Sequence, residues 1–178
     1  MIVDLLSLKI NTPARSTPPG RGFYQREEDA LYVQAGGFIS RKFFSELGAK
    51  YVRFELDLTG CLISIEVTLP RRRWQVQTDL VAPVIAEPAD VRWLDFRSQI
   101  EEPEFITDED RSSLLLRFVR SDSQRWYTLA DSIMVQVDDN DNLMSLLITG
   151  IVEDLAGQQI SAFRGLIDRT LEEDVTAN

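Results

Sequence analysis

The feature that most constrains the fold is an internal repeat, because two stretches of the chain match each other at a shift of 81 positions. The first runs from Phe54 to Val67 and the second from Val135 to Ile148. Most aligned pairs agree in apolar or polar character, and three are identical: Asp57 and Asp138, Leu62 and Leu143, Ser64 and Ser145. A stretch that occurs twice predicts two similar folding units, which bury their apolar faces against each other.

Each stretch has the pattern of a β-hairpin. Phe54 and Leu56 alternate with Arg53 and Glu55, the period of two that places apolar side chains on one face of a strand. The segments Asp-Leu-Thr-Gly and Asp-Asp-Asn-Asp-Asn are typical of turns, and an apolar run follows each. The pattern therefore predicts antiparallel strands joined by short turns.

The repeat extends upstream at slightly larger shifts. Residues 29–33 correspond to residues 111–115 at a shift of 82, and residues 3–8 to residues 91–96 at a shift of 88. Each unit then has about four antiparallel strands. We therefore predict a mainly β protein, α+β at most, in which two tandem antiparallel β repeats pack into one globular unit.

The predicted organisation is a single globular domain with four parts. They are a first β repeat over residues 1–80 with an irregular loop at 11–22, a proline-containing linker at 81–90, a second β repeat at 91–153, and a C-terminal helix with an acidic tail at 154–178. Trp74–Gln77 alternates and predicts a further strand, which the nearby prolines place at an edge or in a linker.

Helix is expected at two places. Near the C-terminus, apolar residues recur at spacings of three, four and four: Ile160, Phe163, Ile167 and Leu171. They form one apolar face over about residues 158–173, which covers the repeats or docks on a second chain. A shorter helix is expected from Ser40 to Leu47, ended by Gly48.

The chain has no histidine and a single cysteine, Cys61. Ser-His-Asp and Cys-His catalytic sites and His-ligated zinc are therefore excluded, and Cys61 has no basic neighbour in sequence to activate its thiolate. Gly36 and Gly37 lack the spacing of a phosphate-binding loop. Catalysis is thus the less favoured interpretation, and no cofactor is expected.

The cysteine count, the hydropathy and the charge of the chain indicate its compartment and its partners. A single cysteine favours a reducing compartment, and neither a basic signal peptide nor a membrane-length apolar run is present, so we expect a cytoplasmic protein without membrane contact. The net charge of −10 lies in residues 89–178, which hold 19 acidic against 8 basic side chains. Duplex nucleic acid is not expected as a partner, because binding it requires a basic surface. The expected partner is a second copy or another protein, of basic character.

Two clusters are candidate sites. Asp138, Asp139 and Asp141 alternate oxygen ligands as calcium loops do, but the residues at the glycine and glutamate positions of such a loop are Leu143 and Thr149. An acidic hairpin turn is therefore the favoured interpretation. Arg71-Arg72-Arg73-Trp74 predicts either an interaction surface or a charged strand edge that deters pairing between sheets.

Two motifs in the first unit carry a resemblance to a known family. The first comprises Tyr24, Glu27 and Asp29–Val33, and the second comprises Asp57, Gly60, Leu62, Ile65 and Glu66. Over about residues 24–67 they resemble a small bacterial family of uncharacterised domains, which begin Y-D-x-x-x-D-A-L-Y-I and continue with a D-x-x-G-x-I-x-x-I-E hairpin. Gln25 replaces the usual Asp, and in the second unit Asp141 and Leu147 replace the Gly and Glu. The resemblance implies a β-rich fold in an intracellular bacterial setting and implies no activity.

Three functions are compatible with these observations. The leading hypothesis is a non-catalytic protein-interaction module that self-associates. Its candidate surface comprises Arg71, Arg72, Arg73, Trp74, Ile160, Phe163, Ile167 and Leu171. The alternative is a protein that binds a small ligand or a cation with its acidic second half, and a carboxylate-based hydrolase ranks third.

Overall fold

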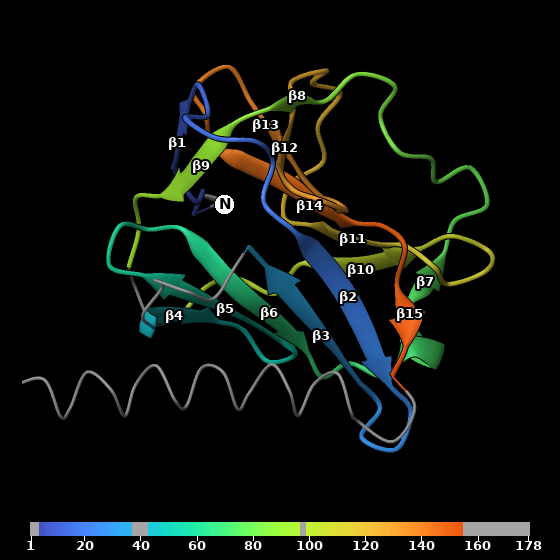
Figure 1. The fold of residues 1–178 in the computed structure, drawn as a ribbon. Helices are drawn as coiled ribbons and strands as arrows, with labels where there is room; N and C mark the ends of the chain where they lie inside the picture. The colour runs from blue at the N-terminus through green and yellow to red at the C-terminus, as the bar shows by residue number, and fades with distance from the viewer. Residues whose placement is uncertain (1–3, 37–42, 97–98, 155–178) are drawn as a thin grey trace, which may run out of the picture.

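The computed structural model describes residues 4–36, 43–96 and 99–154. The described part folds into strands and one 3-10 turn, η1 (Arg71–Arg73), which confirms a mainly β protein. Two sheets pack face to face, and a short third sheet lies beside them (Figure 1). The C-terminal residues Ile160, Phe163, Ile167 and Leu171 lie outside the described residues, and so does the predicted helix.

The first sheet has six strands, all antiparallel to their neighbours except β15. Their order across the sheet is β15 (Val152–Glu153), β2 (Gly20–Gln25), β3 (Ala30–Ala35), β6 (Leu62–Val67), β5 (Val52–Asp57) and β4 (Phe43–Gly48). Consecutive strands β5 and β6 form the hairpin expected around Asp57, while β3 pairs with β6 rather than with β4. β15 pairs with β2 in parallel.

The second sheet has seven strands in a matching succession. Their order is β7 (Gln75–Val76), β10 (Glu104–Thr107), β11 (Leu114–Arg117), β14 (Leu143–Ile148), β13 (Ile133–Val137), β12 (Trp126–Ala130) and β8 (Glu87–Pro88). The two-residue edge strands β7 and β8 are parallel to their neighbours. The expected strand after Trp74 is present as β7, and Pro88 lies in an edge strand, where its missing N–H costs no ladder bond.

The two halves of the chain exchange strands. β7 follows the hairpin of the first half but pairs with β10 in the second sheet, and β15 follows the hairpin of the second half but pairs with β2 in the first. The third sheet joins β1 (Leu8–Asn11) and β9 (Asp90–Trp93), one strand from each half. Each half therefore completes the other, and the fold depends on pairing between residues far apart in sequence.

The facing sides of the two sheets form one core. β5 contributes Phe54 and Leu56, and β13 contributes Ile133 and Val135, all fully buried. Trp93 of β9 closes one end of this core, with its ring centroid 6.3 Å from that of Phe54. The polar neighbours of these apolar residues point outward, as the alternation predicts.

The β5–β6 turn is held by one carboxylate. Oδ1 of Asp57 accepts hydrogen bonds from the backbone N–H groups of Thr59 and Cys61, at 2.9 and 3.0 Å. Gly60 has a φ of 85°, in the left-handed region that glycine adopts without strain. A Cβ at Gly60 would overlap the carbonyl oxygen of Trp93, so this turn packs directly on β9.

Two alignments from the sequence need correction. Leu31 pairs with Val67 and Leu114 pairs with Ile148, so Leu31 corresponds to Leu114, at a shift of 83 rather than 82. Tyr24 pairs with Leu31 and Thr107 pairs with Leu114, so the β2–β3 and β10–β11 connections between these pairs have the same length. Upstream, the N–H of Leu8 donates to Asp141 and that of Trp93 donates to Gly60, so the correspondence there is 85 rather than 88.

The helix predicted for Ser40–Leu47 is wrong where the structure describes it. Phe43–Gly48 forms strand β4, which pairs with β5 and buries Leu47 completely. Pairing with β5 satisfies the backbone and outweighs local helix propensity. The irregular loop expected at 11–22 is also shorter, since Gly20–Gly22 belong to β2.

Candidate interaction surface

The segment 77–86, which we call the linker, crosses one face of the seven-stranded sheet. It joins β7 to β8, and these strands lie at opposite edges of that sheet. The six inter-strand spacings between them amount to about 29 Å, and ten residues span at most about 35 Å. The linker therefore has little slack beyond the turn at its start, in which the N–H of Leu80 donates to the carbonyl of Gln77 at 3.1 Å.

The linker crosses the outer face, away from the core. Its residue Leu80 packs with Trp126 and Met134 against a separate buried group on the outer side of the sheet: Ile106, Leu115 and Leu147. At its far end, the carbonyl of Ala86 accepts a hydrogen bond from Thr128 at 3.5 Å. Leu80, Trp126 and Met134 are all half-buried, so each keeps part of its side chain exposed.

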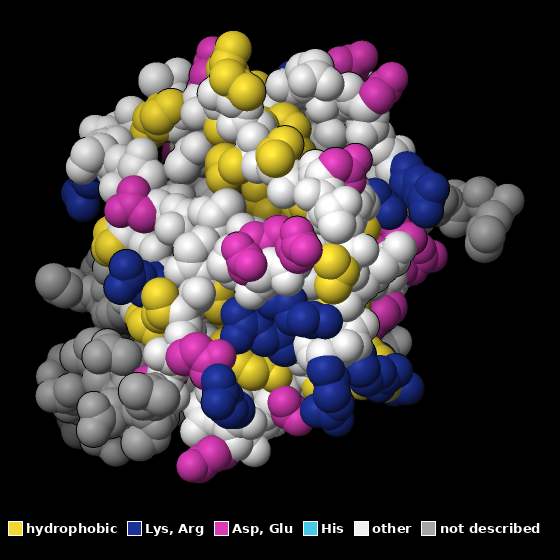
Figure 2. Space-filling model, turned by 90° about the vertical axis from the view of Figure 1, so that its right-hand side faces the viewer, with side chains coloured by type: hydrophobic (Ala, Val, Ile, Leu, Met, Phe, Trp, Pro, Cys, Tyr) yellow, Lys and Arg dark blue, Asp and Glu magenta, His cyan; other side chains and the backbone are white. Residues whose placement is uncertain are grey.

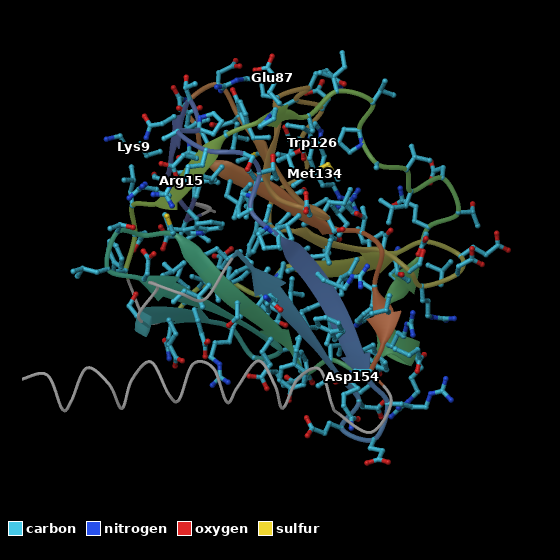
Figure 3. The ribbon with its side chains drawn as sticks, viewed as in Figure 1. Lys9, Arg15, Glu87, Trp126, Met134 and Asp154 are labelled. Atoms are coloured by element: carbon cyan, nitrogen blue, oxygen red, sulfur yellow. The ribbon has the colours of Figure 1, made fainter. Side chains whose placement is uncertain are left out.

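Apolar side chains on the linker point into solvent. Val81 is 79% exposed, Ile85 is 74% exposed and Val84 is fully exposed. In Figure 3, Trp126 and Met134 lie beside each other, below Glu87 at the end of the linker. Hydrophobic side chains gather in the upper half of this side of the molecule, above a lower half rich in charged side chains (Figure 2). We call the set Leu80, Val81, Val84, Ile85, Trp126 and Met134 the linker patch.

The outer face of the other sheet carries charges at the corresponding positions. Arg53 and Glu66 are cross-strand partners on β5 and β6, and their side chains form an ion pair. Met134 and Leu147 are cross-strand partners on β13 and β14, 81 positions later. One face is thus polar and the other apolar at an equivalent place. Contiguous apolar surface of this kind marks interaction sites on folded proteins.

Arg71, the first residue of the predicted basic surface, is a structural clamp. Its guanidinium donates to the backbone carbonyl of Arg111, binds the carboxylate of Glu153 at 2.9 Å and lies 5.0 Å from the ring centroid of Tyr24. It therefore ties η1 to the β10–β11 turn and to β15. Its positive charge is paired with a carboxylate of the same fold.

The rest of the cluster divides between surface and core. Arg72 pairs with Asp29 at 2.7 Å, and the Arg73 guanidinium lies 5.6 Å from the ring centroid of Tyr51. Trp74 is only 2% exposed, so it is not a surface residue. These four residues form a junction between strands, with two exposed arginines and a buried tryptophan.

Two residues of the family-like opening motif take part in the same junction. The hydroxyl of Tyr24 donates to Asp29 at 2.8 Å and accepts from the N–H of Arg71 at 3.1 Å. Burial raises the pKa of Tyr24. Hydrogen bonds from Arg72 and then from Tyr24 lower the pKa of Asp29. The motif has a structural explanation here, as a link between the β2–β3 turn and η1.

The acidic turn has the same geometry as the turn around Asp57. Oδ1 of Asp138 accepts from the N–H groups of Asn140 and Asn142, both at 2.9 Å, and Oδ2 accepts from the Asn142 side chain at 3.0 Å. Burial favours the neutral form of Asp138, but these hydrogen bonds outweigh it and lower its pKa. Asp141 has a φ of 59° and pairs with Arg125 at 2.8 Å.

These bonds leave the acidic turn poorly arranged for a cation. The carboxylate of Asp138 points back into its own turn, that of Asp141 is neutralised by Arg125, and Asp139 is exposed. Within residues 4–36, 43–96 and 99–154, no three metal-ligating side chains gather as a bound ion requires. The turn is explained by its own hydrogen bonds.

Two further features offer little chemistry. Sγ of Cys61 lies 3.6 Å from the Thr59 hydroxyl and 4.0 Å from the carboxylate of Asp90, which itself binds Arg92. A small recess lined partly by the carboxylates of Asp4 and Glu101 has room for about one water molecule. A recess of that size does not admit the sugar or peptide that a hydrolase would bind.

Sequence reasoning assigned the exposed part of the linker patch to a plain linker and therefore missed it. A signal was present, since Leu80–Ala86 is apolar throughout, whereas connecting segments are usually polar. The face that this segment crosses could not be predicted from the sequence, because it depends on the order of the strands in the sheet.

No helix in the described residues is long and apolar enough to cross a membrane. No protein-family model matches the chain, and no curated protein matches its sequence.

Proposed function

We propose that this protein is a non-catalytic interaction module that self-associates through the linker patch. One observation carries the proposal. Met134 and Leu147 form an apolar pair on the outer face that the linker covers in part, whereas the equivalent pair on the other sheet is Arg53 and Glu66. An ordinary solvent-facing sheet surface keeps charges there. Leu147 is covered by the chain itself, but Val81, Val84 and Ile85 above it stay exposed, and exposed apolar side chains gathered in one place favour a surface that is covered in the working assembly.

The expected driving force is hydrophobic burial. Fully burying a side chain such as Val84 or Ile85 contributes roughly 1.5–3 kcal/mol, from which the loss of translational and rotational freedom must be subtracted. Enough favourable free energy for a moderate association comes from burying Val81, Val84, Ile85 and the exposed parts of Trp126 and Met134. The high net negative charge of each copy opposes it, so added salt should strengthen association.

The test is the oligomeric state of a patch variant. We expect the wild-type chain to sediment as a dimer or larger species at micromolar concentration, and the double variant Val84→Lys, Ile85→Lys to sediment as a monomer. Leu58→Lys is the matched control, since Leu58 is 68% exposed in the β5–β6 turn, outside the patch; it should behave as wild type. A wild-type chain that is monomeric at every concentration and salt would contradict the proposal.

We also infer that the fold arose by tandem duplication with reciprocal strand exchange. The strand succession of the two sheets, the shared turn bonds of Asp57 and Asp138, and the exchange of β7 and β15 support it. In both hairpins the register shifts at the corresponding place, at Glu55/Leu56 and at Gln136/Val137. We further propose that residues 24–67 are related to the uncharacterised bacterial family that they resemble. We also propose that the protein works in a reducing, cytoplasmic setting.

A further inference from the structure

We propose that the occupant of the linker patch is the C-terminal segment, residues 155–178, of a second copy of this chain. This rests on the proposed function, because it names the partner of the same surface. Three observations carry it: the apolar face that the segment's sequence predicts, the place where the segment leaves the described fold, and the charges that border the patch.

The segment has the apolar spacing that the patch requires. Ile160, Phe163, Ile167 and Leu171 predict one apolar face over residues 158–173. A helix of that length is about 24 Å long, and the five longer strands of the seven-stranded sheet span about 19 Å. One such helix can therefore extend across these five strands. An amphipathic helix laid in an apolar groove is a recurrent mode of recognition.

The segment of the same copy leaves the described fold beside the six-stranded sheet. It begins after Asp154, whose N–H donates to Tyr24 in the six-stranded sheet at 2.9 Å. Residues 155–157 span at most about 11 Å, so the apolar face of the same copy begins near β15 and the six-stranded sheet, whereas the patch lies on the outer face of the other sheet. Figure 3 places Asp154 at the lower edge of the molecule, well below Trp126 and Met134. The segment of a second copy is not tied to this starting place.

At one border of the patch, two arginines share a single carboxylate. Arg120 is 81% exposed and reaches Glu104, which also pairs with Arg117. Glu104 and Arg117 lie on the outer face, two positions from the buried Ile106 and Leu115. The acidic run Glu172-Glu173-Asp174 follows the apolar face of the segment. A segment laid with this run toward Arg120 pairs opposite charges across the interface.

The test is a site-directed disulfide in the full-length chain. In a Cys61→Ser background, Val84→Cys and Phe163→Cys are combined and the protein is oxidised. We expect a reducible dimer on a denaturing gel. The matched control combines Leu58→Cys with Phe163→Cys and should stay monomeric. A disulfide within one chain, recognised by faster migration as a monomer, would overturn the assignment to a second copy.

A second measurement separates the occupant from the proposed function. Phe163→Glu should abolish the dimer in sedimentation, and Phe163→Leu should retain it, with far-UV circular dichroism matching wild type in both. If the Val84→Lys, Ile85→Lys variant is monomeric while Phe163→Glu still dimerises and no disulfide forms, another part of the partner covers the patch. That result sinks this inference and leaves the proposed function standing. A monomeric wild type would remove both.

Discussion

At the scale of single residues, the chain uses its charged side chains to build turns and junctions. Asp57 and Asp138 each accept backbone N–H groups within their own turn, and Arg71 joins three segments. None of these roles needs a ligand. The acidic cluster that the sequence presents as a candidate cation site is therefore better explained as a turn whose first carboxylate is already hydrogen-bonded.

The role of Asp138 predicts a pH-dependent loss of stability in Asp138→Asn. The pKa of Asp138 is lowered by folding, so its ionised form stabilises the fold above the unfolded pKa of about 3.9, and this stabilisation is lost as the pH falls through the folded pKa. At neutral pH the free energy of unfolding of the variant should be about 1 kcal/mol lower than that of wild type. Urea denaturation should show the difference closing as the pH is lowered below 4.

The control for this prediction is Asp139→Asn. Asp139 is exposed in the same turn, so its substitution changes the net charge equally without removing the carboxylate that holds the turn. Its unfolding free energy should stay close to that of wild type from neutral to acidic pH. An equal loss in both variants would mean that general charge, rather than the bonds of Asp138, sets the effect.

At the scale of elements, the turns matter for what they pack against. The β5–β6 turn is pressed on β9 at Gly60, whereas Gly150, after β14, has a similar φ of 61° in open surroundings, with its nearest side-chain atom at 3.8 Å. Both glycines adopt a conformation that other residues avoid. Only Gly60 also has no room for a side chain.

Alanine substitutions should distinguish these two costs. Gly150→Ala should lower the free energy of unfolding by about 1–2 kcal/mol, the cost of a left-handed conformation. Gly60→Ala carries the same cost and must also displace β9 from the turn, which adds roughly 1–3 kcal/mol. Urea denaturation of both variants measures the difference. Equal losses would show that β9 moves away from the turn freely.

At the scale of the whole molecule, neither half is complete without the other. β7 and β15 each finish the sheet of the opposite half, and the core is lined from both sheets. The polar and apolar outer faces then differ, and this difference is what supports an assembly built on one side of the sandwich.

The strand exchange predicts that the chain survives a cut in the linker. A protease site inserted between Val81 and Ala82, in the Val84→Lys, Ile85→Lys background that should be monomeric, should be cleaved, because both residues are exposed in the single chain. The two fragments should then co-elute in size-exclusion chromatography, since β7, β15 and the β1–β9 pair hold them together. Addition of urea should separate them. Fragments that part under native conditions would contradict the interdependence of the halves.

Much of the local structure could be predicted from the residues alone. Alternation around Phe54 and Val135 predicts half-buried strands, and Asp57 and Asp138 predict tight turns, because these patterns act over a few neighbouring residues. The residues of Ser40–Leu47 show the limit of such reasoning: local propensity favours helix, and pairing with β5 makes its described part a strand. Of the site, only the apolar content of residues 80–86 was readable.

The sequence by itself determined a mainly β chain with two matching hairpins and an unusually apolar connection between them. Only the tertiary structure decided that β3 pairs with β6, that β7 and β15 change sheets, that Trp74 is buried, and that the linker crosses the outer face. The physical reason is range. Periodicity and turn chemistry act between neighbours, whereas strand order results from many long-range pairings chosen together, and the linker patch exists only once that order is set.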